Sequence, residues 1–354
     1  ALVRAWIADA PAGLRVEPVR ADADGFALAR AWTARQLGLP RTPAPDAPAL
    51  PRAGDTYFMP DLDHAGVVAK RDLYRAMRRD GVRVAFMVHD LLPVTRPEFF
   101  PPHAARSHAE WLAVVAEADI AACPTQAVAE DLKAWVRAHG PERAESLHIV
   151  ASHHGADLRA APAARGLDRE SLRLLARLSG ARAFLMVGTV EPRKGHADAV
   201  DAFERLWAAG GSEILVIAGR PGWMVESLVA RLRGHPERNR RLFYVETATD
   251  DLVDQLYVTC GCLIMASHAE GFGLPLVEAA ARGCSVIARD IPVFREVAGE
   301  RACYFEGGGD ALAQAVDRWR RLDRRGEAPR PRRSGILTWA QSARNLGRLL
   351  TEER

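Results

Sequence analysis

Two carboxylates flank a Gly-Phe-Gly turn in the stretch EGFGLPLVE, residues 270–278, where Glu270 and Glu278 stand eight positions apart. The turn opens an apolar helical segment. The first backbone N–H groups of a helix have no intrahelical partner and lie at the positive end of its dipole, so this segment predicts a seat for a diphosphate. The plainer interpretation is that Glu270 caps the helix, Glu278 is a solvated helix residue and the glycines only turn the chain.

A second stretch, GTVEPRKGH at 188–196, places two adjacent cations, Arg193 and Lys194, at a turn between an apolar run and a helical pattern. Gly188 at its start permits close backbone approach to a ligand, and paired cations suit the oxygens of a diphosphate leaving group. Of the 48 basic residues, the lysines are only Lys70, Lys133 and Lys194. A solvated pair of loop charges is the alternative interpretation.

Further polar or glycine residues follow other apolar runs. Gly219 comes directly after EILVIA, and Thr249 precedes Asp250 and Asp251 after LFYV. We interpret Thr249 as part of an edge that contacts a nucleotide base, although helix capping explains the same residues. His89 and Asp90 follow VRVAFMV, where a histidine oriented by Asp90 could bind a sugar hydroxyl or stabilise a developing charge. A single histidine in such a place is more often structural.

Short apolar runs alternate with helical patterns through most of the chain, which predicts parallel strands joined by right-handed crossovers. Strands are expected at 56–59, 82–88, 120–123, 147–150, 184–187, 213–218, 242–245, 262–266 and 285–288. Helices are expected at 26–37, 65–79, 103–118, 125–139 and 338–351. Ligands of open parallel sheets bind beyond the carboxyl ends of the strands, which is where the residues named above lie.

Length and composition indicate two ordinary domains, since 354 residues with 48% hydrophobic content can bury two cores. The predicted domains are residues 1–165 and 166–334, with a linker within 155–179, and residues 335–354 form a helix that packs back on the first domain. The chain holds no run of 18 apolar residues, and its start is too short for a signal peptide, so a cytoplasmic location is expected. The chain does not begin with Met, which leaves open an element before Ala1.

The cysteines and acidic motifs favour a protein without metal. The five cysteines are odd in number and lie in apolar contexts, which favours buried free thiols, and Cys260-Gly-Cys262 lacks the second ligand pair of a zinc site. Asp61 and Asp63 have the Asp-x-Asp spacing by which some nucleotide-sugar enzymes hold a divalent cation. Arg193, Lys194 and the helix start at 271–274 already suit the same diphosphate. The motifs of dinucleotide-binding and P-loop proteins are missing from the sequence.

A basic stretch from Arg318 to Arg333 has eight arginines against Asp323 and Glu327, a local balance of +6. Such a charge attracts an anionic membrane surface or an anionic acceptor, so peripheral contact at the inner face of the cell membrane is one interpretation. A solvated basic linker is the other. Nucleic acid is disfavoured because aromatic residues are not interleaved with the arginines.

The motifs GTVEPRKGH and SHAEGFGLPLVEAAARGCSVIARDIPVFREVAG, with the Glu-x7-Glu spacing of Glu270 and Glu278, closely resemble the retaining glycosyltransferases of family 4. HDLLPVTRPEFFP at 89–101 is similar to bacterial mannosyltransferase-like members. The resemblance covers about residues 55–350 and is more specific in the second domain. It implies the GT-B fold, an α/β architecture of two Rossmann-like doubly wound parallel-sheet domains facing across a cleft. The family's first strand and Gly-rich turn have no match before residue 54, so the N-terminal domain is expected to be reduced unless they precede Ala1.

The resemblance implies transfer of a hexose, without a cofactor or metal and with retention of configuration, from a nucleotide diphosphate sugar to a glycan or lipid-linked acceptor. Mannose from GDP-mannose in bacterial surface polysaccharide or lipopolysaccharide synthesis is the expected case. Arg193 and Lys194 would hold the diphosphate, Glu278 the ribose, and Glu270 and His89 the donor sugar. Thr189 replaces the arginine that many relatives have there. The donor site as implied comprises Gly188, Thr189, Arg193, Lys194, Gly219, Thr249, Glu270, Gly271, Phe272, Gly273, Leu274 and Glu278.

Three alternatives stay open at this point. The same fold could serve a nucleotide-sugar epimerase or a phosphorylase. A truncated module could bind a nucleotide sugar without turnover, which the unmatched N-terminal turn favours and the intact charged residues disfavour. Within the transferase interpretation, no residue stands out as a nucleophile, so departure of the diphosphate from the face that the acceptor attacks is favoured over a covalent glycosyl enzyme.

Overall fold

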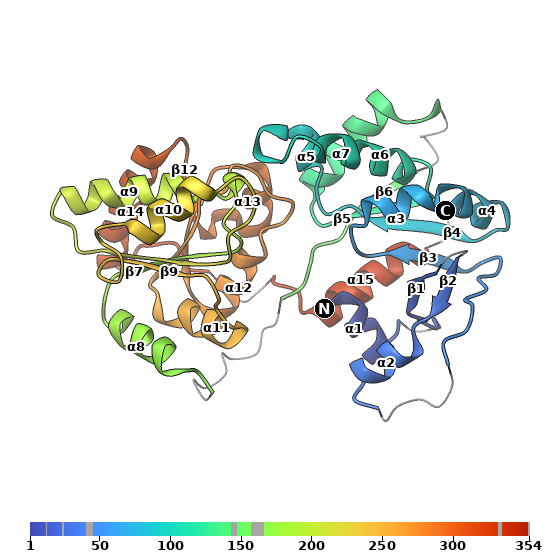
Figure 1. Ribbon diagram of the computed structural model, residues 1–354, viewed down its shortest axis with the longest axis horizontal. Helices are drawn as coiled ribbons and strands as arrows, with labels where there is room; N and C mark the ends of the chain where they lie inside the picture. The colour runs from blue at the N-terminus through green and yellow to red at the C-terminus, as the bar shows by residue number, and fades with distance from the viewer. Residues whose placement is uncertain are drawn as a thin grey trace. The chain divides into compact units, whose positions relative to one another are not determined.

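The computed structural model describes residues 1–11, 13–22, 25–39, 45–142, 147–156, 166–331 and 335–352. The chain divides into two compact units (Figure 1). Unit 1 comprises Ala1–Thr95, His103–Gly155 and Leu337–Arg354, and unit 2 comprises Arg96–Pro102 and Ala156–Ile336. The predicted linker contains the helix α8 (Arg169–Leu178), and its residues 157–165 lie outside the described ranges.

Unit 2 is built on six parallel strands. They are β7 (Ala183–Val187), β8 (Ile214–Ala218), β9 (Leu242–Val245), β10 (Cys262–Met265), β11 (Ser285–Arg289) and β12 (Cys303–Phe305). Their spatial order is β12-β11-β10-β7-β8-β9. The chain therefore winds outward from β7 in one direction, returns, and winds outward from β10 in the other. This reversal makes unit 2 a doubly wound sheet whose switch point lies between β7 and β10.

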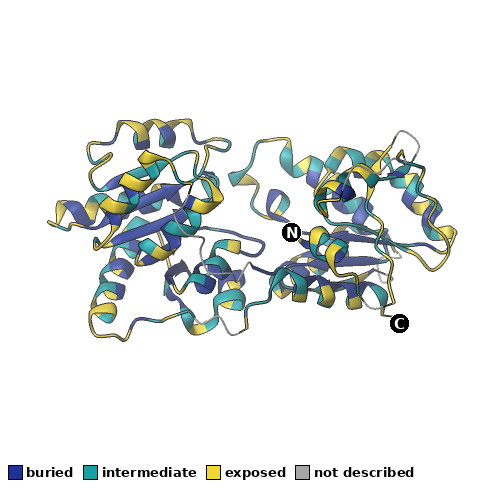
Figure 2. Ribbon diagram, turned by 90° about the horizontal axis from the view of Figure 1, so that it is seen from below, coloured by how far each residue is buried: buried dark blue, intermediate teal, exposed yellow. Residues whose placement is uncertain are grey.

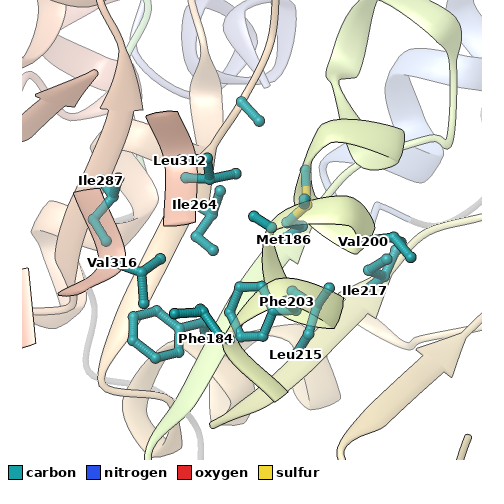
Figure 3. Close-up of a cluster of buried hydrophobic side chains, with 14 of the residues drawn as sticks. Phe184, Met186, Val200, Phe203, Leu215, Ile217, Ile264, Ile287, Leu312 and Val316 are labelled. Atoms are coloured by element: carbon teal, nitrogen blue, oxygen red, sulfur yellow. The ribbon is translucent and has the colours of Figure 1, made fainter. Parts of the chain in front are cut away.

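Helices cover both faces of this sheet, as Figure 1 shows. One face carries α9 (His196–Ala208), α10 (Glu226–Gly234) and α14 (Gly309–Arg324). The other carries α11 (Asp250–Thr259) and α12 (Leu274–Arg282), and α13 (Pro292–Ala298) and the short η4 (Gly299–Arg301) connect β11 to β12. On the first face Phe203 of α9 and Leu312 of α14 pack against Phe184 and Ile264 of the strands (Figure 3). The strands are buried on both faces, which explains their continuous apolar runs.

Unit 1 has a smaller parallel sheet of β3 (Thr56–Met59), β4 (Arg83–Met87), β5 (Ile120–Cys123) and β6 (His148–Ala151). The strands lie side by side in sequence order. Before them, β1 (Val19–Ala21) and β2 (Phe26–Leu28) form an antiparallel hairpin. Because every right-handed crossover then advances in the same direction, the connecting helices fall on one face of the sheet. The sheet of unit 1 thus has four strands and no switch point, whereas that of unit 2 has six strands and one switch point.

The helices of that face are α3 (His64–Ala69), α4 (Arg71–Arg79), α6 (Ala104–Val115) and α7 (Gln126–His139), with the short α5 (Leu92–Thr95) between β4 and α6. The opposite face is covered by the two ends of the chain, α1 (Leu2–Ala8) and α15 (Trp339–Thr351). Side chains of β4 alternate between these layers: Val84 and Phe86 face the crossover helices, and Ala85 and Met87 face α1 and α15. Figure 2 shows the inner strands of both sheets as largely buried and the outward sides of the helices as exposed, while the edge strands β3, β6 and β9 are mostly intermediate.

Most predicted elements are confirmed, two predicted helices differ in form, and several short elements, α1, β1 and β12 among them, were not predicted. The predicted helix at 26–37 begins as strand β2 and becomes α2 (Arg30–Gln36) only after Ala29, because residues 26–28 pair with β1. The predicted helix at 65–79 is two helices that meet at Lys70, whose φ of −101° and ψ of 16° interrupt the helical path. Strand β12 was not predicted, since its three residues carry little periodic signal.

The α/β class with parallel sheets is confirmed. All five cysteines lie in the described part of the chain and are buried free thiols, as expected. In the same part of the chain, no helix has the length and apolar character that crossing a membrane requires.

Candidate functional site

Two loops meet at the switch point of unit 2. The loop after β7 ends in the short η3 (Pro192–Lys194) and Gly195, and the loop after β10 runs from Ala266 to Gly273. Gly195 has φ +67°, and a Cβ atom on it would lie 2.2 Å from the carbonyl oxygen of Ala266. The loops therefore touch through their backbones at a position that only glycine allows. The carboxyl ends of β7 and β10 thereby bring Arg193, Lys194 and Glu270 together.

Glu270 is the centre of this arrangement. One of its carboxylate oxygens accepts a hydrogen bond from Arg193 Nη1 at 2.8 Å, and the other accepts from Lys194 Nζ at 2.6 Å and from Ser267 Oγ at 2.8 Å. Burial acts to raise the pKa of this carboxyl, but the charges of Lys194 and Arg193 outweigh burial and hold the pKa below its usual value. Glu270 is thus a stable anion that orients two cations.

Glu191 lies on the other side of Arg193, whose Nε is 2.9 Å from Glu191 Oε2. Burial raises the pKa of Glu191 against the opposing charges of Arg193 and Lys194. The side chains of Arg193 and Lys194 are 15% and 16% exposed, whereas those of Glu191 and Glu270 are 8% and 7% exposed. The carboxylates therefore lie beneath the cations, which remain the more accessible groups for an anionic ligand.

The start of helix α12 supplies further positive potential. Gly273 is its N-cap with φ +85°, and Pro275 occupies the first turn. Within the described residues, neither a side-chain cap nor an acidic residue of the first turn offsets the positive end of the helix dipole. Phe272 is buried in a small apolar cluster with Val277 and Ala156, while Leu274 is 38% exposed. The turn Gly271–Leu274 is thus anchored from inside and accessible at the helix start.

Glu278 follows one turn further along α12. Its Oε2 accepts a hydrogen bond from the Tyr257 hydroxyl at 2.8 Å, which ties α12 to α11. Burial raises the pKa of Glu278, partly opposed by this hydrogen bond and by Arg282. Glu278 is therefore not the solvated helix residue of the plainer interpretation.

The remaining predicted donor-site residues have clear local roles. A Cβ atom on Gly219 would lie 1.8 Å from the Gly188 carbonyl oxygen, so Gly219 permits the close approach of the adjacent strand exits, whereas Gly188 is favoured by its φ of +129°. Thr189 is half-buried after β7. Thr249 caps α11, since its hydroxyl accepts from Leu252 N at 3.2 Å. A contact of these residues with a nucleotide stays a prediction.

A small cavity opens between the ends of β7 and β10 and is lined by Lys194, His196, Ser267 and strand residues. His196 is fully buried, and burial lowers its pKa to about 3, so its ring is neutral. A hydrogen bond with the backbone of Glu191 and the charge of Glu270 oppose this lowering only in part. The cavity therefore offers a neutral imidazole beside a lysine.

Sequence reasoning missed a second cluster, which joins the loop after β10 to α9 and to the end of β11. His268 Nε2 lies 3.1 Å from Asp198 Oδ2, and Arg289 Nη2 lies 2.6 Å from the same oxygen. The ring of His268 stacks on Phe99, with centroids 5.4 Å apart. His268 stands two residues before Glu270, and Asp198 stands two after His196; proximity to the motifs was the available signal. Their pairing depends on the fold.

His89 lies in unit 1, two residues after the end of β4. Its Nε2 is 3.0 Å from the Pro60 carbonyl oxygen, and its ring lies 5.8 Å from that of His154. Asp90 Oδ1 accepts from Leu92 N at 3.0 Å, at the start of α5. The Asp-x-Asp motif also has local roles: Asp63 caps α3 by accepting from Gly66 N at 2.9 Å, and Asp61 accepts from Leu62 N. Over the described ranges, no group of three or more His, Cys, Asp or Glu residues is arranged to hold a metal ion.

Of the predicted basic stretch, Arg332 and Arg333 lie outside the described residues. Arg320 is paired with the buried Glu213 at 2.9 Å, and Arg318 donates to the Tyr304 carbonyl. Three other side chains are exposed at the end of α14, namely Arg321, Arg324 and Arg325. The basic character thus survives at the surface in reduced form.

Comparison with known proteins finds similarity to glycosyltransferases. Residues 173–330 match the family model described as "Glycosyl transferases group 1". The serotype-specific mannosyltransferase WbdA of Escherichia coli is 44% identical over 274 residues, which cover 76% of this chain and 34% of that protein. The O-antigen chain mannosyltransferase B of Escherichia coli is 26% identical over 146 residues, or 39% of this chain and 38% of that protein. This chain spans about a third of the length of the curated relatives it matches.

Solved structures agree on the fold. Anabaena Alr3699/HepE in complex with UDP and glucose has a TM-score of 0.58 at 17% identity and covers 83% of this chain and 74% of its own. An α,α-trehalose-phosphate synthase (UDP-forming) from Burkholderia vietnamiensis has a TM-score of 0.59 at 17% identity, with coverages of 91% and 71%. At this identity the likeness shows the GT-B fold alone.

Proposed function

We propose that this chain, whose residues 173–330 match the family model of the glycosyl transferases group 1, moves a hexose from a nucleotide diphosphate sugar to an acceptor hydroxyl. The observation that carries the proposal is the pair of partly exposed cations, Arg193 and Lys194, held over the buried Glu270 beside the start of α12. A doubly wound sheet binds its ligand at this switch point. The arrangement suits a doubly charged leaving group.

The proposed donor is GDP-mannose and the proposed acceptor a glycan or lipid-linked saccharide of bacterial surface polysaccharide synthesis. Support comes from the relatives named serotype-specific mannosyltransferase and O-antigen chain mannosyltransferase. UDP is the alternative nucleotide, since HepE was solved with UDP and glucose. Tyr257 fixes the Glu278 carboxyl by a hydrogen bond, which leaves its second oxygen to accept from a ribose hydroxyl.

The chemistry assigned to these residues is stabilisation of departing charge. The bond between the anomeric carbon and the phosphate oxygen breaks, and a bond from that carbon to the acceptor oxygen forms. Arg193, Lys194 and the positive end of the α12 dipole stabilise the diphosphate as its negative charge grows, which is the dominant catalytic contribution in sites of this kind. The acceptor's proton passes to the leaving phosphate oxygen, so the chain itself needs no general base for this step.

We further propose that the anomeric configuration is retained and that no metal ion takes part. Glu270 already accepts hydrogen bonds from two cations and Ser267, which makes it a poor nucleophile for a covalent intermediate. Attack and departure on one face of the sugar give retention without such an intermediate. The two cations and the helix start neutralise the negative charge of the diphosphate, which is the task that a divalent ion would otherwise perform.

A nucleotide panel tests the donor site. Melting temperature is measured with GDP, UDP, ADP and dTDP, each with and without EDTA. Binding to the folded state alone stabilises a protein by mass action, so GDP at about 100 times its Kd should add roughly 2.7 kcal/mol. We expect the largest shift with GDP and the same shift in EDTA. No shift with any nucleotide would overturn the donor site, and a shift abolished by EDTA would overturn metal independence.

Turnover then separates a transferase from a binder. GDP-mannose is incubated with mannose-containing acceptors, and the product's anomeric configuration is read by NMR against the α-linked donor. An α-linked product is expected. Glu278→Ala should reduce hydrolysis or transfer relative to the wild type. A reduction that arises mainly from weaker nucleotide binding would support the ribose role. Nucleotide binding without any transfer or hydrolysis would favour the non-catalytic module.

The exposed arginines of α14 supply a peripheral membrane contact in this proposal. Co-sedimentation with vesicles that contain anionic lipid should fall on charge reversal of Arg321, Arg324 and Arg325 together, and should be weak with neutral vesicles. Vesicle binding that does not change on charge reversal would overturn the membrane role. The proposal of transferase activity does not depend on this result.

A further inference from the structure

We propose that His268 is a positioning residue, a latch that fixes the loop carrying Glu270 against the turn carrying Arg193 and Lys194. This inference rests on the proposed function for its kinetic consequence, but the latch itself is a property of the fold. His268 is bonded to both sides of the switch point: its backbone N–H donates to the Arg193 carbonyl oxygen at 2.7 Å, and its ring Nε2 lies 3.1 Å from Asp198 Oδ2 in the first turn of α9.

Asp198 connects the latch to the end of a third strand. Arg289, the last residue of β11, bonds the same carboxylate oxygen at 2.6 Å and donates through Nε to the Ala266 carbonyl oxygen at 2.9 Å. The side chains of Asp198 and Arg289 are 22% and 9% exposed. Burial acts to raise the pKa of Asp198, but the bonds to His268 and the charge of Arg289 lower it overall. The exits of β10 and β11 and the start of α9 thus share one charged carboxylate.

An aromatic segment holds the free side of the ring. Phe99, in the short η1 (Pro97–Phe99), stacks on His268 with an interplanar angle of 25°. The segment Arg96–Pro102 belongs to unit 2, although the residues before and after it in sequence belong to unit 1. Trp223 in the loop after β8 donates from Nε1 to the Phe99 carbonyl oxygen at 2.8 Å and stacks on Phe100.

These contacts give His268 a defined task. Its ring is fixed by a carboxylate at one edge and by an aromatic face, while its backbone fixes Arg193. The loop between Ala266 and Glu270 cannot shift relative to η3 unless one of these bonds breaks. Displacement of a catalytic group by about 1 Å can cost on the order of 100-fold in rate. The latch therefore preserves the spacing of Glu270 and the two cations that the transition state requires.

The variants His268→Ala, His268→Gln and Phe99→Leu test the latch. Glutamine can place an amide N–H near the position of Nε2, so it restores the bond to Asp198 without an ionisable ring. We expect His268→Ala to lower kcat on the order of 100-fold with a Kd for the nucleotide within about threefold of wild type. His268→Gln should recover most of kcat, and Phe99→Leu should fall between the two.

His235→Ala is the matched control. His235 Nε2 lies 2.8 Å from Glu204 Oε1 and packs edge-on against Trp207, so the same kind of pair is removed. His235 ends α10 and precedes β9. It therefore lies towards the amino ends of the strands, whereas the switch-point loops follow their carboxyl ends. Its loss should leave kcat unchanged.

Hydrogen exchange measured by mass spectrometry reads the latch without any substrate. In His268→Ala, backbone amides of residues 188–195 and 266–273 should exchange faster, and those of the remaining described parts of unit 2 should not. A His268→Gln variant as inactive as His268→Ala would overturn positioning in favour of proton transfer. Unchanged exchange and kcat in His268→Ala would overturn the latch. Absence of nucleotide binding by the wild type would instead overturn the proposed function, and the exchange result would still decide the latch.

Discussion

The two parallel sheets of this chain use similar strands and differ in the order of those strands. In unit 2 the order reverses between β7 and β10, and in unit 1 β3 to β6 follow one another without reversal. At the reversal, the chain leaves β7 and β10 towards helices on opposite faces of the sheet. The two loops that follow these strands bring Arg193, Lys194 and Glu270 together. In unit 1 all crossover helices lie on one face of the sheet, so the opposite face is covered by α1 and α15 instead.

The comparison teaches that one topological choice decides both where charge gathers and what closes the core. Unit 2 has two layers of crossover helices and concentrates ion pairs at its switch point. Unit 1 has one such layer and gathers histidines at the carboxyl ends of its strands: His89 after β4, and His153 and His154 after β6. The units should therefore respond differently to acid, to substitution of charge and to substitution in the core.

Acid should separate the units most strongly. Burial lowers the pKa of His108 and of His154 in unit 1 to about 4, from 6.5, and that of His196 in unit 2 to about 3. A histidine with a lowered folded pKa binds its proton more readily when unfolded, so stability is full above about pH 6.5 and falls as pH drops towards the folded pKa. Each histidine lowers the free energy of unfolding by on the order of 3 kcal/mol in acid, so the two in unit 1 lower it by about 6 kcal/mol.

Hydrogen exchange from pH 7 to 4, corrected for intrinsic exchange rates, measures this difference. Core amides of unit 1 should lose protection at higher pH than those of unit 2. His108→Gln removes one titrating ring and should shift the loss in unit 1 to lower pH, with unit 2 unaffected. Equal loss in both units would contradict the assignment of the acid-sensitive groups.

Lys194→Ala should produce the largest effect on chemistry. It removes a cation that the proposed leaving group needs, so kcat should fall on the order of 10²- to 10³-fold, about 3 to 4 kcal/mol of transition-state stabilisation. The melting temperature should fall moderately because the buried Glu270 loses one of its two cationic partners, and the fold should stay intact because Arg193 and Ser267 still donate to that carboxylate. Lys133→Ala, which removes an exposed pair with Glu130 in unit 1, is the control and should leave kcat unchanged. Turnover that survives Lys194→Ala would remove this residue from the leaving-group role.

Leu346→Ala tests whether the terminal helices close the core of unit 1. Leu346 of α15 is 1% exposed, and truncation should cost about 3 kcal/mol. Leu312→Ala, fully buried in unit 2, is the matched change and should cost a similar amount. Urea unfolding followed by hydrogen exchange should show the loss of stability in unit 1 for Leu346→Ala and in unit 2 for Leu312→Ala. Nucleotide affinity extrapolated to zero urea should survive Leu346→Ala, and a lost affinity would contradict separate cores.

Two capping threonines give the smallest and sharpest test. Thr125 caps α7 in unit 1 and Thr249 caps α11 in unit 2, each accepting from a backbone N–H at 3.2 Å. Substitution of either by alanine should cost about 1 kcal/mol of stability. If Thr249 also forms the predicted base-contacting edge, Thr249→Ala should weaken nucleotide binding as well, whereas Thr125→Ala should not. Equal nucleotide affinity in the two variants would leave Thr249 as a cap only.

The sequence predicted what depends on local pattern and on the rule for strand exits. Continuous apolar runs located the strands, and the rule drew attention to Arg193, Lys194 and Glu270, which the structure joins by direct hydrogen bonds. The Asp198–His268 pair escaped prediction because Asp198 lies in the first turn of α9, away from the strand exits to which the rule directs attention. No periodicity reports which two loops a switch point will bring into contact. The hairpin strand β2 escaped because its pairing with β1 overrides local helical preference.

The pairing of α1 with α15 affects the order in which the chain can fold during synthesis. Trp6 Nε1 donates to the Ala343 carbonyl oxygen across 337 positions. On the ribosome, all residues of unit 2 emerge before α15, so unit 2 can finish folding first although unit 1 begins first. Until then the face of Ala85, Met87 and Ile120 lacks its last helix and presents apolar surface. This interval is when the nascent chain is most exposed to aggregation and most suited to chaperone binding.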